Sequence, residues 1–202
     1  MVAAAGWAPG DVLKAWEVVR GSHAHVEFGF SCMGHEIPAA LGIRMHEGPE
    51  GEIVVLIGDG TYLMGASELL TSVQHGLKVT VVVLDNGGYG SIDALARTSA
   101  GISVGNRFTD AAGGPLPVDF AANAASFGCH AHRVTTLSEL SAALEHARAA
   151  DRTTVIHCPT VPGRPLPPSG AFWDLGVPEA GGDGADALAA QLAGRATQRL
   201  GR

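Results

Sequence analysis

Two short runs of β-branched residues, each ending at a polar corner rich in glycine, constrain the fold of this 202-residue chain most strongly. Residues 53–57 read IVVLI and run into GDG, and residues 78–84 read KVTVVVL and run into DNGGYG. Between them, apolar residues recur at three- and four-residue spacing over residues 62–76, which predicts a helix that stops at a glycine. Parallel strands need such a crossover, so the segment predicts one βαβ unit.

Further elements extend this alternation along the chain. The other expected strands are at residues 25–28, 129–134 and 153–158. The other expected helices are at residues 37–45, 118–127 and 137–147, the last of them preceded by a capping-box pattern, TLSE. Alternating strands and helices predict a three-layer α/β/α sandwich with a mostly parallel sheet. Two segments rich in glycine, proline and small polar residues, 99–117 and 159–170, are expected to be surface loops.

Charge and hydropathy exclude several classes of partner. Thirteen Lys and Arg against twenty Asp and Glu give a net charge of −7, the wrong sign for binding nucleic acid or an anionic membrane. The longest aliphatic runs are far too short to span a membrane, and the N-terminus lacks the features of a signal peptide. Three scattered cysteines, Cys32, Cys129 and Cys158, suit reduced thiols, so we expect a cytoplasmic protein. Only 16% of the residues are charged, and so weakly charged a surface suggests a protein partner.

The two corners carry the residue types of a metal and phosphate site. In a parallel sheet, ligands bind at the carboxyl ends of the strands. There Asp59 would supply a carboxylate and Asn86 a neutral carbonyl, beside glycines that let the backbone approach phosphate groups. Mg²⁺ prefers oxygen ligands and is commonly shared with phosphates, so the corners predict bound Mg²⁺ and a diphosphate. Taken alone, both residues are also common turn formers at strand ends.

The spacing of the corners resembles that of thiamine-diphosphate enzymes. GDG is followed by 25 residues and then by Asn86, which matches the signature of that family. The resemblance implies that the side chains of Asp59 and Asn86 and the backbone carbonyl of Gly88 bind Mg²⁺. This chain has Asp85 where many members of the family carry an additional asparagine. The residues expected to border the diphosphate are Gly58, Gly60, Thr61, Tyr89 and Gly90.

An upstream segment, EFGFSCMGHEIPAALG, resembles the loop and helix that hold the two rings of the same cofactor. Met33 falls where the family uses a bulky apolar side chain to keep the cofactor bent. A backbone carbonyl near Ser31 would accept a hydrogen bond from the 4′-amino group, and Cys32 completes the expected cofactor-binding residues of this loop. His35 and Glu36 are candidate acid–base groups, and plain surface positions describe them equally well.

Within this superfamily, the segments VEFGFSCMGHE, LDNGGYGSI and SGAFWDLGVPE are most similar to a family of hydrolases that open a cyclic diketone in myo-inositol catabolism. The resemblance implies covalent catalysis by the cofactor, cleavage of a carbon–carbon bond, and release of the product by water. Two alternatives stay open: another thiamine-diphosphate lyase, acetolactate-synthase-like or decarboxylase-like, and a cofactor-binding module without turnover. The similarity ends near Glu179. We therefore assign residues 1–179 to one cofactor-binding domain and residues 180–202 to a tail that is either a terminal helix or an extension.

The resemblance also implies that part of the active site lies elsewhere. In the family, the glutamate that activates the cofactor belongs to a separate pyrimidine-binding domain, which this chain is too short to contain. We therefore expect the chain to bind thiamine diphosphate and Mg²⁺ and to need a pyrimidine-binding domain or subunit in trans, within a homo- or hetero-oligomer. Trp173 and Asp174 resemble part of the family's cap over the substrate.

Two groupings of histidine and cysteine contain residue types that can bind zinc. One comprises Cys129, His130 and His132, and the other comprises His157 and Cys158. Neither has an established zinc-ligand spacing, so we interpret these side chains as strand residues.

Overall fold

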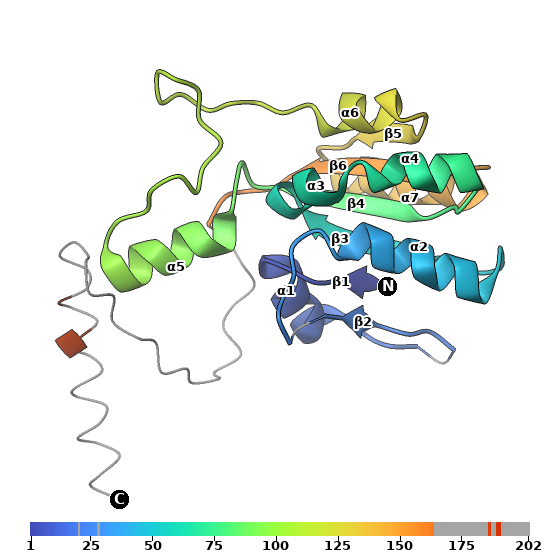
Figure 1. Ribbon diagram of the computed structural model, residues 1–202, viewed down its shortest axis with the longest axis horizontal. Coiled ribbons are helices and arrows are strands. Elements are labelled where there is room, and N and C mark those ends of the chain that lie inside the picture. Colours follow the sequence, from blue (N-terminus) through green and yellow to red (C-terminus); the bar gives the residue numbers. More distant parts are fainter. Residues whose placement is uncertain (20, 28, 164–185, 187–188, 191–202) are drawn as a thin grey trace, which may run out of the picture.

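The computed structural model describes residues 1–163, 186, 189 and 190, except residues 20 and 28. In this part of the chain, a six-stranded sheet has the order β2-β1-β3-β4-β6-β5, and every pairing is parallel. Figure 1 shows the sheet with its helices. The strands are Val2–Ala3 (β1), His25–Val26 (β2), Val54–Gly58 (β3), Thr80–Asp85 (β4), His130–Arg133 (β5) and Thr154–Pro159 (β6).

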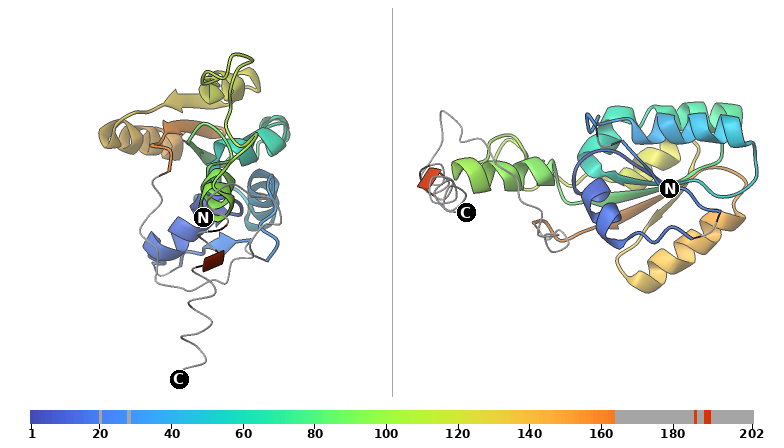
Figure 2. Two further views of the ribbon diagram at one scale, coloured as in Figure 1. Left: turned by 90° about the vertical axis from the view of Figure 1, so that its left-hand side faces the viewer. Right: turned by 90° about the horizontal axis from the view of Figure 1, so that it is seen from below.

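Helices cover both faces of the sheet and make three layers. Figure 2 shows α2 and α4 on one face and α1 and α7 on the other. The helices are Trp7–Ala15 (α1), Glu36–Glu47 (α2), Asp59–Gly65 (α3), Glu68–His75 (α4), Gly90–Ala100 (α5), Phe120–Ser126 (α6) and Leu137–Ala149 (α7). The architecture is the three-layer α/β/α sandwich that the sequence predicts.

Side chains of the central strands alternate between two apolar clusters because successive residues of a strand point to opposite faces. Val55 and Val81 belong to the larger cluster, which also contains residues of α2, α4 and α6. Val54 and Val82 belong to the smaller cluster, which contains Ala143 of α7. Burial on both faces explains why these strands read as uninterrupted apolar runs in the sequence.

The helix predicted over residues 62–76 is wrong in two respects. The chain forms two helices, and the first of them begins at Asp59, inside the corner itself. The expected apolar face is also only partly buried. Of its residues, Leu69 is fully buried, whereas Leu63, Met64 and Leu70 are about half exposed, and the fully buried Tyr62 lies outside that face. Gly65 packs against the backbone of Gly34 where α3 ends, a contact that helical periodicity does not encode.

The remaining predicted elements lie within a few residues of their expected positions, although β2 is short. Sequence reasoning missed β1, α1 and α5. In Figure 1, α5 lies beyond the carboxyl edge of the sheet, away from the helices that cover its faces. The described part of the chain contains no helix long and apolar enough to cross a membrane. The expected tail, apart from residues 186, 189 and 190, lies outside the described residues, as do Trp173 and Asp174.

Candidate cofactor and metal site

The two corners meet at the carboxyl edge of the sheet, because β3 and β4 are parallel neighbours with Gly58 paired to Leu84. Asp59 is only 1% exposed, and its Oδ2 accepts a hydrogen bond of 2.7 Å from the Gly88 N–H. Its Oδ1 accepts a second bond, 3.0 Å long, from the Gly60 N–H. One buried carboxylate therefore links both corners.

Asn86 presents a buried oxygen with no partner. Its side-chain Oδ1 is inaccessible to solvent and accepts no hydrogen bond in the described part of the chain. Buried polar atoms are nearly always hydrogen-bonded in proteins, so an unsatisfied carbonyl oxygen in a cavity wall indicates a ligand. A metal ion that accepts oxygen ligands would satisfy it.

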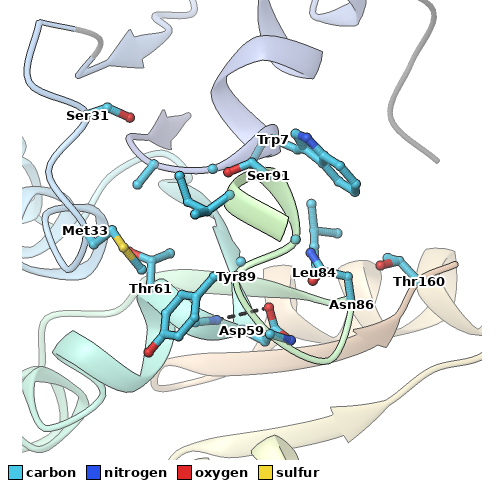
Figure 3. Close-up of a pocket in the computed structure, with 18 of the residues that line it drawn as sticks. Trp7, Ser31, Met33, Asp59, Thr61, Leu84, Asn86, Tyr89, Ser91 and Thr160 are labelled. Carbon is cyan, nitrogen blue, oxygen red and sulfur yellow. Dashed lines mark hydrogen bonds between the residues drawn. The ribbon is translucent and has the colours of Figure 1, made fainter. Parts of the chain in front are cut away.

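A cavity of about 710 Å³ opens in front of the corners. Its wall is built from the segment after β1, the loop before α2, the two corners, the first residues of α5 and the end of β6. Figure 3 shows Met33 and Thr61 on one side and Asn86 and Thr160 on the other. The volume suits a cofactor-sized ligand.

Three glycines of the corners are required by close contacts. A Cβ at Gly60 would lie 2.6 Å from the Tyr89 ring, and one at Gly90 would lie 2.6 Å from Asn86 Oδ1. Gly88 has a φ of +144°, and a Cβ there would collide with the backbone carbonyl of Asn106. At Gly88 both the conformation and the space therefore disfavour a side chain, whereas at Gly60 and Gly90 the lack of space alone does so.

The charge of the site favours a bound cation. Burial raises the pKa of Asp59 to about 6; the Gly88 N–H opposes this shift, and the neighbouring Asp85 carboxylate adds to it. Two carboxylates side by side in a partly dry site are costly without a counter-charge. A divalent cation would supply that charge.

The loop before α2 brings two of its three expected cofactor-binding residues to the cavity. Ser31 and Met33 line the cavity, and Met33 is 38% exposed. Ser31 has a positive φ of 52°, and its hydroxyl donates to the Ala4 carbonyl. Cys32 is exposed and is not part of the wall; its N–H donates to the Glu27 carboxylate, which also accepts from the N–H of Phe30.

The two acid–base candidates do not line the cavity. His35 stacks on His25, with Nε2 atoms 3.3 Å apart. Glu36 is fully buried, where it accepts hydrogen bonds from the Ala5 N–H and the Thr61 hydroxyl. Glu36 therefore supports the wall from behind, by joining the segment after β1 to α3.

Comparison with known proteins gives the family. The family described as thiamine pyrophosphate enzyme, C-terminal TPP binding domain, matches residues 4–158. The chain belongs to this family. Thiamine diphosphate is accordingly the cofactor of the domain, as the resemblance implies.

The curated relatives are longer proteins. The chain is 38% identical over 180 residues to 3D-(3,5/4)-trihydroxycyclohexane-1,2-dione hydrolase of Halalkalibacterium halodurans. It is 35% identical over 179 residues to the protein of the same name from Listeria monocytogenes. Each match covers 89% of this chain and 28% of the relative, so the chain spans less than a third of these proteins.

A solved structure shares the fold. Benzoylformate decarboxylase from Polynucleobacter necessarius superposes with a TM-score of 0.69 at 23% identity, over 79% of this chain and 29% of that one. At this identity the match shows the α/β architecture alone.

The residues present fit thiamine diphosphate held through Mg²⁺. Asp59 gives an anionic oxygen, Asn86 an unsatisfied amide oxygen, and the glycines leave room for phosphate oxygens. All are hard oxygen donors of the kind that Mg²⁺ prefers. The described residues contain no group of three or more His, Cys, Asp or Glu side chains that could hold a metal ion.

Gly88→Ala is expected to lower the free energy of unfolding by about 3–5 kcal/mol, since backbone strain and a steric clash add. Urea unfolding followed by circular dichroism measures this loss. Gly105→Ala is the matched control: Gly105 also has a positive φ, +71°, but nothing lies within 4 Å of its added Cβ. The control should lose only about 1–2 kcal/mol. Equal losses in the two variants would show that the close contact at Gly88 is unimportant.

Glu36→Gln is expected to flatten the dependence of stability on pH. Burial raises the pKa of Glu36 above its ordinary value, although hydrogen bonds from its own and the Ala5 N–H and from the Thr61 hydroxyl oppose the shift. The folded state then holds a proton that the unfolded state has lost, so the free energy of unfolding falls as pH rises above the ordinary value. Urea unfolding at about pH 5 and about pH 8 compares the slopes.

Glu139→Gln is the control for this measurement. The Thr135 N–H and hydroxyl lower the pKa of exposed Glu139, so this group is ionised in both the folded and the unfolded state over most of the measured range, and its removal should leave the slope between about pH 5 and about pH 8 nearly unchanged. A slope unchanged in Glu36→Gln would contradict the raised pKa.

Sequence reasoning missed the parts of the wall that follow β1 and β6. Trp7 and Gly6 follow β1, which is only two residues long and has no recognisable pattern. Thr160 and Val161 follow β6. They could have been expected, because the rule that ligands bind at carboxyl ends applies to this strand as well.

Proposed function

We propose that this chain is the diphosphate-binding and Mg²⁺-binding part of a hydrolase that cleaves a carbon–carbon bond of a cyclic diketone in myo-inositol catabolism. The observation that carries the proposal is the 35–38% identity, over 89% of the chain, to relatives named as trihydroxycyclohexanedione hydrolases. The site supports it because a buried carboxylate and an unsatisfied amide oxygen meet beside backbone open to phosphates.

In this proposal each wall of the cavity has a separate task. The side chains of Asp59 and Asn86 and the Gly88 carbonyl hold Mg²⁺, and Gly58, Gly60, Thr61, Tyr89 and Gly90 border the diphosphate. Met33 and Ser31, across the cavity, orient the rings. When bound, the cofactor supplies a carbon nucleophile that attacks a carbonyl and so permits an adjacent carbon–carbon bond to break.

Turnover requires a second domain. The described residues that line the cavity include no glutamate that could activate the cofactor. Ile92 and Leu95 of α5 are 50% and 45% exposed, which suits a surface covered by another domain. We propose a pyrimidine-binding domain or subunit in trans, within an oligomer. The three free thiols suit a cytoplasmic location.

The test combines the purified chain with the pyrimidine-binding domain of the Halalkalibacterium relative, thiamine diphosphate and Mg²⁺. Ring opening of the cyclic diketone is expected only when both polypeptides are present. Decarboxylation of benzoylformate without ring opening would favour a related lyase. Saturable cofactor binding without either reaction would identify a binding module and would refute the hydrolase proposal.

A further inference from the structure

A buried histidine and an aspartate form a pair immediately behind the metal corner. His157, in β6, is 2% exposed, and its Nε2 lies 2.8 Å from Oδ2 of Asp85. Asp85 is the last residue of β4 and precedes Asn86. Since β4 and β6 are parallel neighbours, the pair ties β6 to the turn that carries the proposed metal ligands.

The second oxygen of Asp85 acts on the turn itself. Its Oδ1 accepts a hydrogen bond of 2.9 Å from the Gly87 N–H. The next N–H, that of Gly88, donates to Asp59. Two successive amides of the turn are therefore held by two different carboxylates, and these bonds fix the two peptide planes that precede the Gly88 carbonyl. The plane of that carbonyl is held by the Tyr89 N–H, which donates to the Asn106 carbonyl at 2.8 Å.

Hydrogen-bond chemistry determines which atom of the pair is the donor. A carboxylate oxygen accepts, so the proton of this bond is carried by Nε2 of His157. Nδ1 is buried and has no partner in the described part of the chain. The His157 ring also contacts the Phe120 ring edge-on, at a centroid distance of 5.2 Å. Among the described residues, its polar contact is the Nε2–H bond to Asp85.

The Nε2–H of His157 supplies a hydrogen-bond donor to the Asp85 carboxylate. An asparagine at position 85 would have an amide that can donate to a neighbouring carboxylate. Asp85 cannot donate in this way when ionised, and it lies close enough to Asp59 to raise that residue's pKa. The Asp85 carboxylate, next to that of Asp59, therefore needs hydrogen-bond donors from other residues. The His157 side chain and the Gly87 N–H provide them.

We propose that His157 is a positioning residue: its Nε2–H fixes Asp85, which fixes the Gly87 amide and thereby the metal-binding geometry of Asn86 and Gly88. The proposed effect of His157 on metal binding rests on the proposed function of the cofactor site. Its structural basis is present in the chain without cofactor.

The first test measures amide hydrogen exchange in the cofactor-free chain by NMR. His157→Met removes the donor and replaces the ring with a flexible side chain of similar volume. Gly87 and Gly88 should then exchange about tenfold faster or more, relative to β3 amides. His157→Gln has nearly the same shape and retains an N–H donor, so it should restore protection to within about threefold. Equal exchange in the wild type and His157→Met would overturn the proposal, whether or not the chain binds cofactor.

The second test measures the Mg²⁺ affinity by calorimetry at saturating thiamine diphosphate. His157→Met should weaken Mg²⁺ about 10- to 100-fold, as loss of a residue that orients a metal ligand commonly does. His130→Met is the control, because His130 lies on a different strand, β5, and pairs with another aspartate, Asp151, at 2.9 Å. Its Mg²⁺ affinity should be unchanged, and an equal loss there would count against a specific role.

A double-mutant cycle shows whether His157 acts through Asp85. Asp85→Ala combined with His157→Met should lose no more Mg²⁺ affinity than Asp85→Ala alone. Additive losses would overturn the proposed route. If the wild-type chain fails to bind Mg²⁺ with thiamine diphosphate, the proposed function fails, and the exchange measurement still decides the role of His157.

Discussion

Asp59→Ala is expected to weaken Mg²⁺-dependent binding of thiamine diphosphate to the purified chain by about 100-fold or more, equivalent to about 2.7 kcal/mol. The variant removes the only side-chain anion that we assign to the metal. The neutral Asn86 amide and the Gly88 carbonyl that remain would bind a hard divalent cation weakly. Calorimetric titration with and without Mg²⁺ measures the difference.

The fold should survive this substitution. Asp59→Ala leaves the Gly60 and Gly88 N–H groups without their acceptor, but it also removes a buried charge next to Asp85. These effects oppose one another, so the urea midpoint should change little. Asp151→Ala, at an exposed aspartate in the loop between α7 and β6, is the control and should bind normally. Unchanged Mg²⁺-dependent affinity in Asp59→Ala would refute the metal assignment.

Arg44→Met is expected to lower the free energy of unfolding by about 4 kcal/mol, the largest stability effect among these substitutions apart from Gly88→Ala. Arg44 is 5% exposed and donates to four backbone carbonyls. Those carbonyls belong to Lys78, Gly48, Glu50 and Gly51, at distances of 2.8–3.0 Å. Its planar guanidinium thus closes the loop between α2 and β3, and methionine would leave these acceptors unpaired.

Urea unfolding followed by circular dichroism measures this loss. Arg44→Lys should recover only a small part of this loss, because one ammonium group cannot reach the four carbonyls that the planar guanidinium contacts. Arg97→Met, at a side chain that is 60% exposed, is the control and should change stability by less than about 0.5 kcal/mol. A loss below about 1 kcal/mol in Arg44→Met would mean that water satisfies the carbonyls.

The sequence alone predicts the centre of the fold and the metal corner. Buried parallel strands read as unbroken apolar runs, so β3 and β4 are visible without a structure. Parallel pairing then places both strand ends at one edge, which predicts that Asp59 and Asn86 meet. The capping box of α7 is confirmed too, since Thr136 and Glu139 exchange the expected hydrogen bonds. The domain boundary at residue 179 stays a prediction.

Tertiary structure decided the features that depend on residues far apart in the chain. In the sequence, Glu36 is equally compatible with an acid–base group and with a surface position. Only the packing of α2 against the segment after β1 buries it behind the cavity wall. The pairing of His157 with Asp85 joins positions 72 residues apart and exists because β6, not β5, lies beside β4. Local periodicity reports which face of an element is apolar, but it carries no information about strand order. The two corners that form the cofactor site could therefore be predicted from the sequence. The contacts that hold them in place depend on the order of the strands, which the sequence pattern does not reveal.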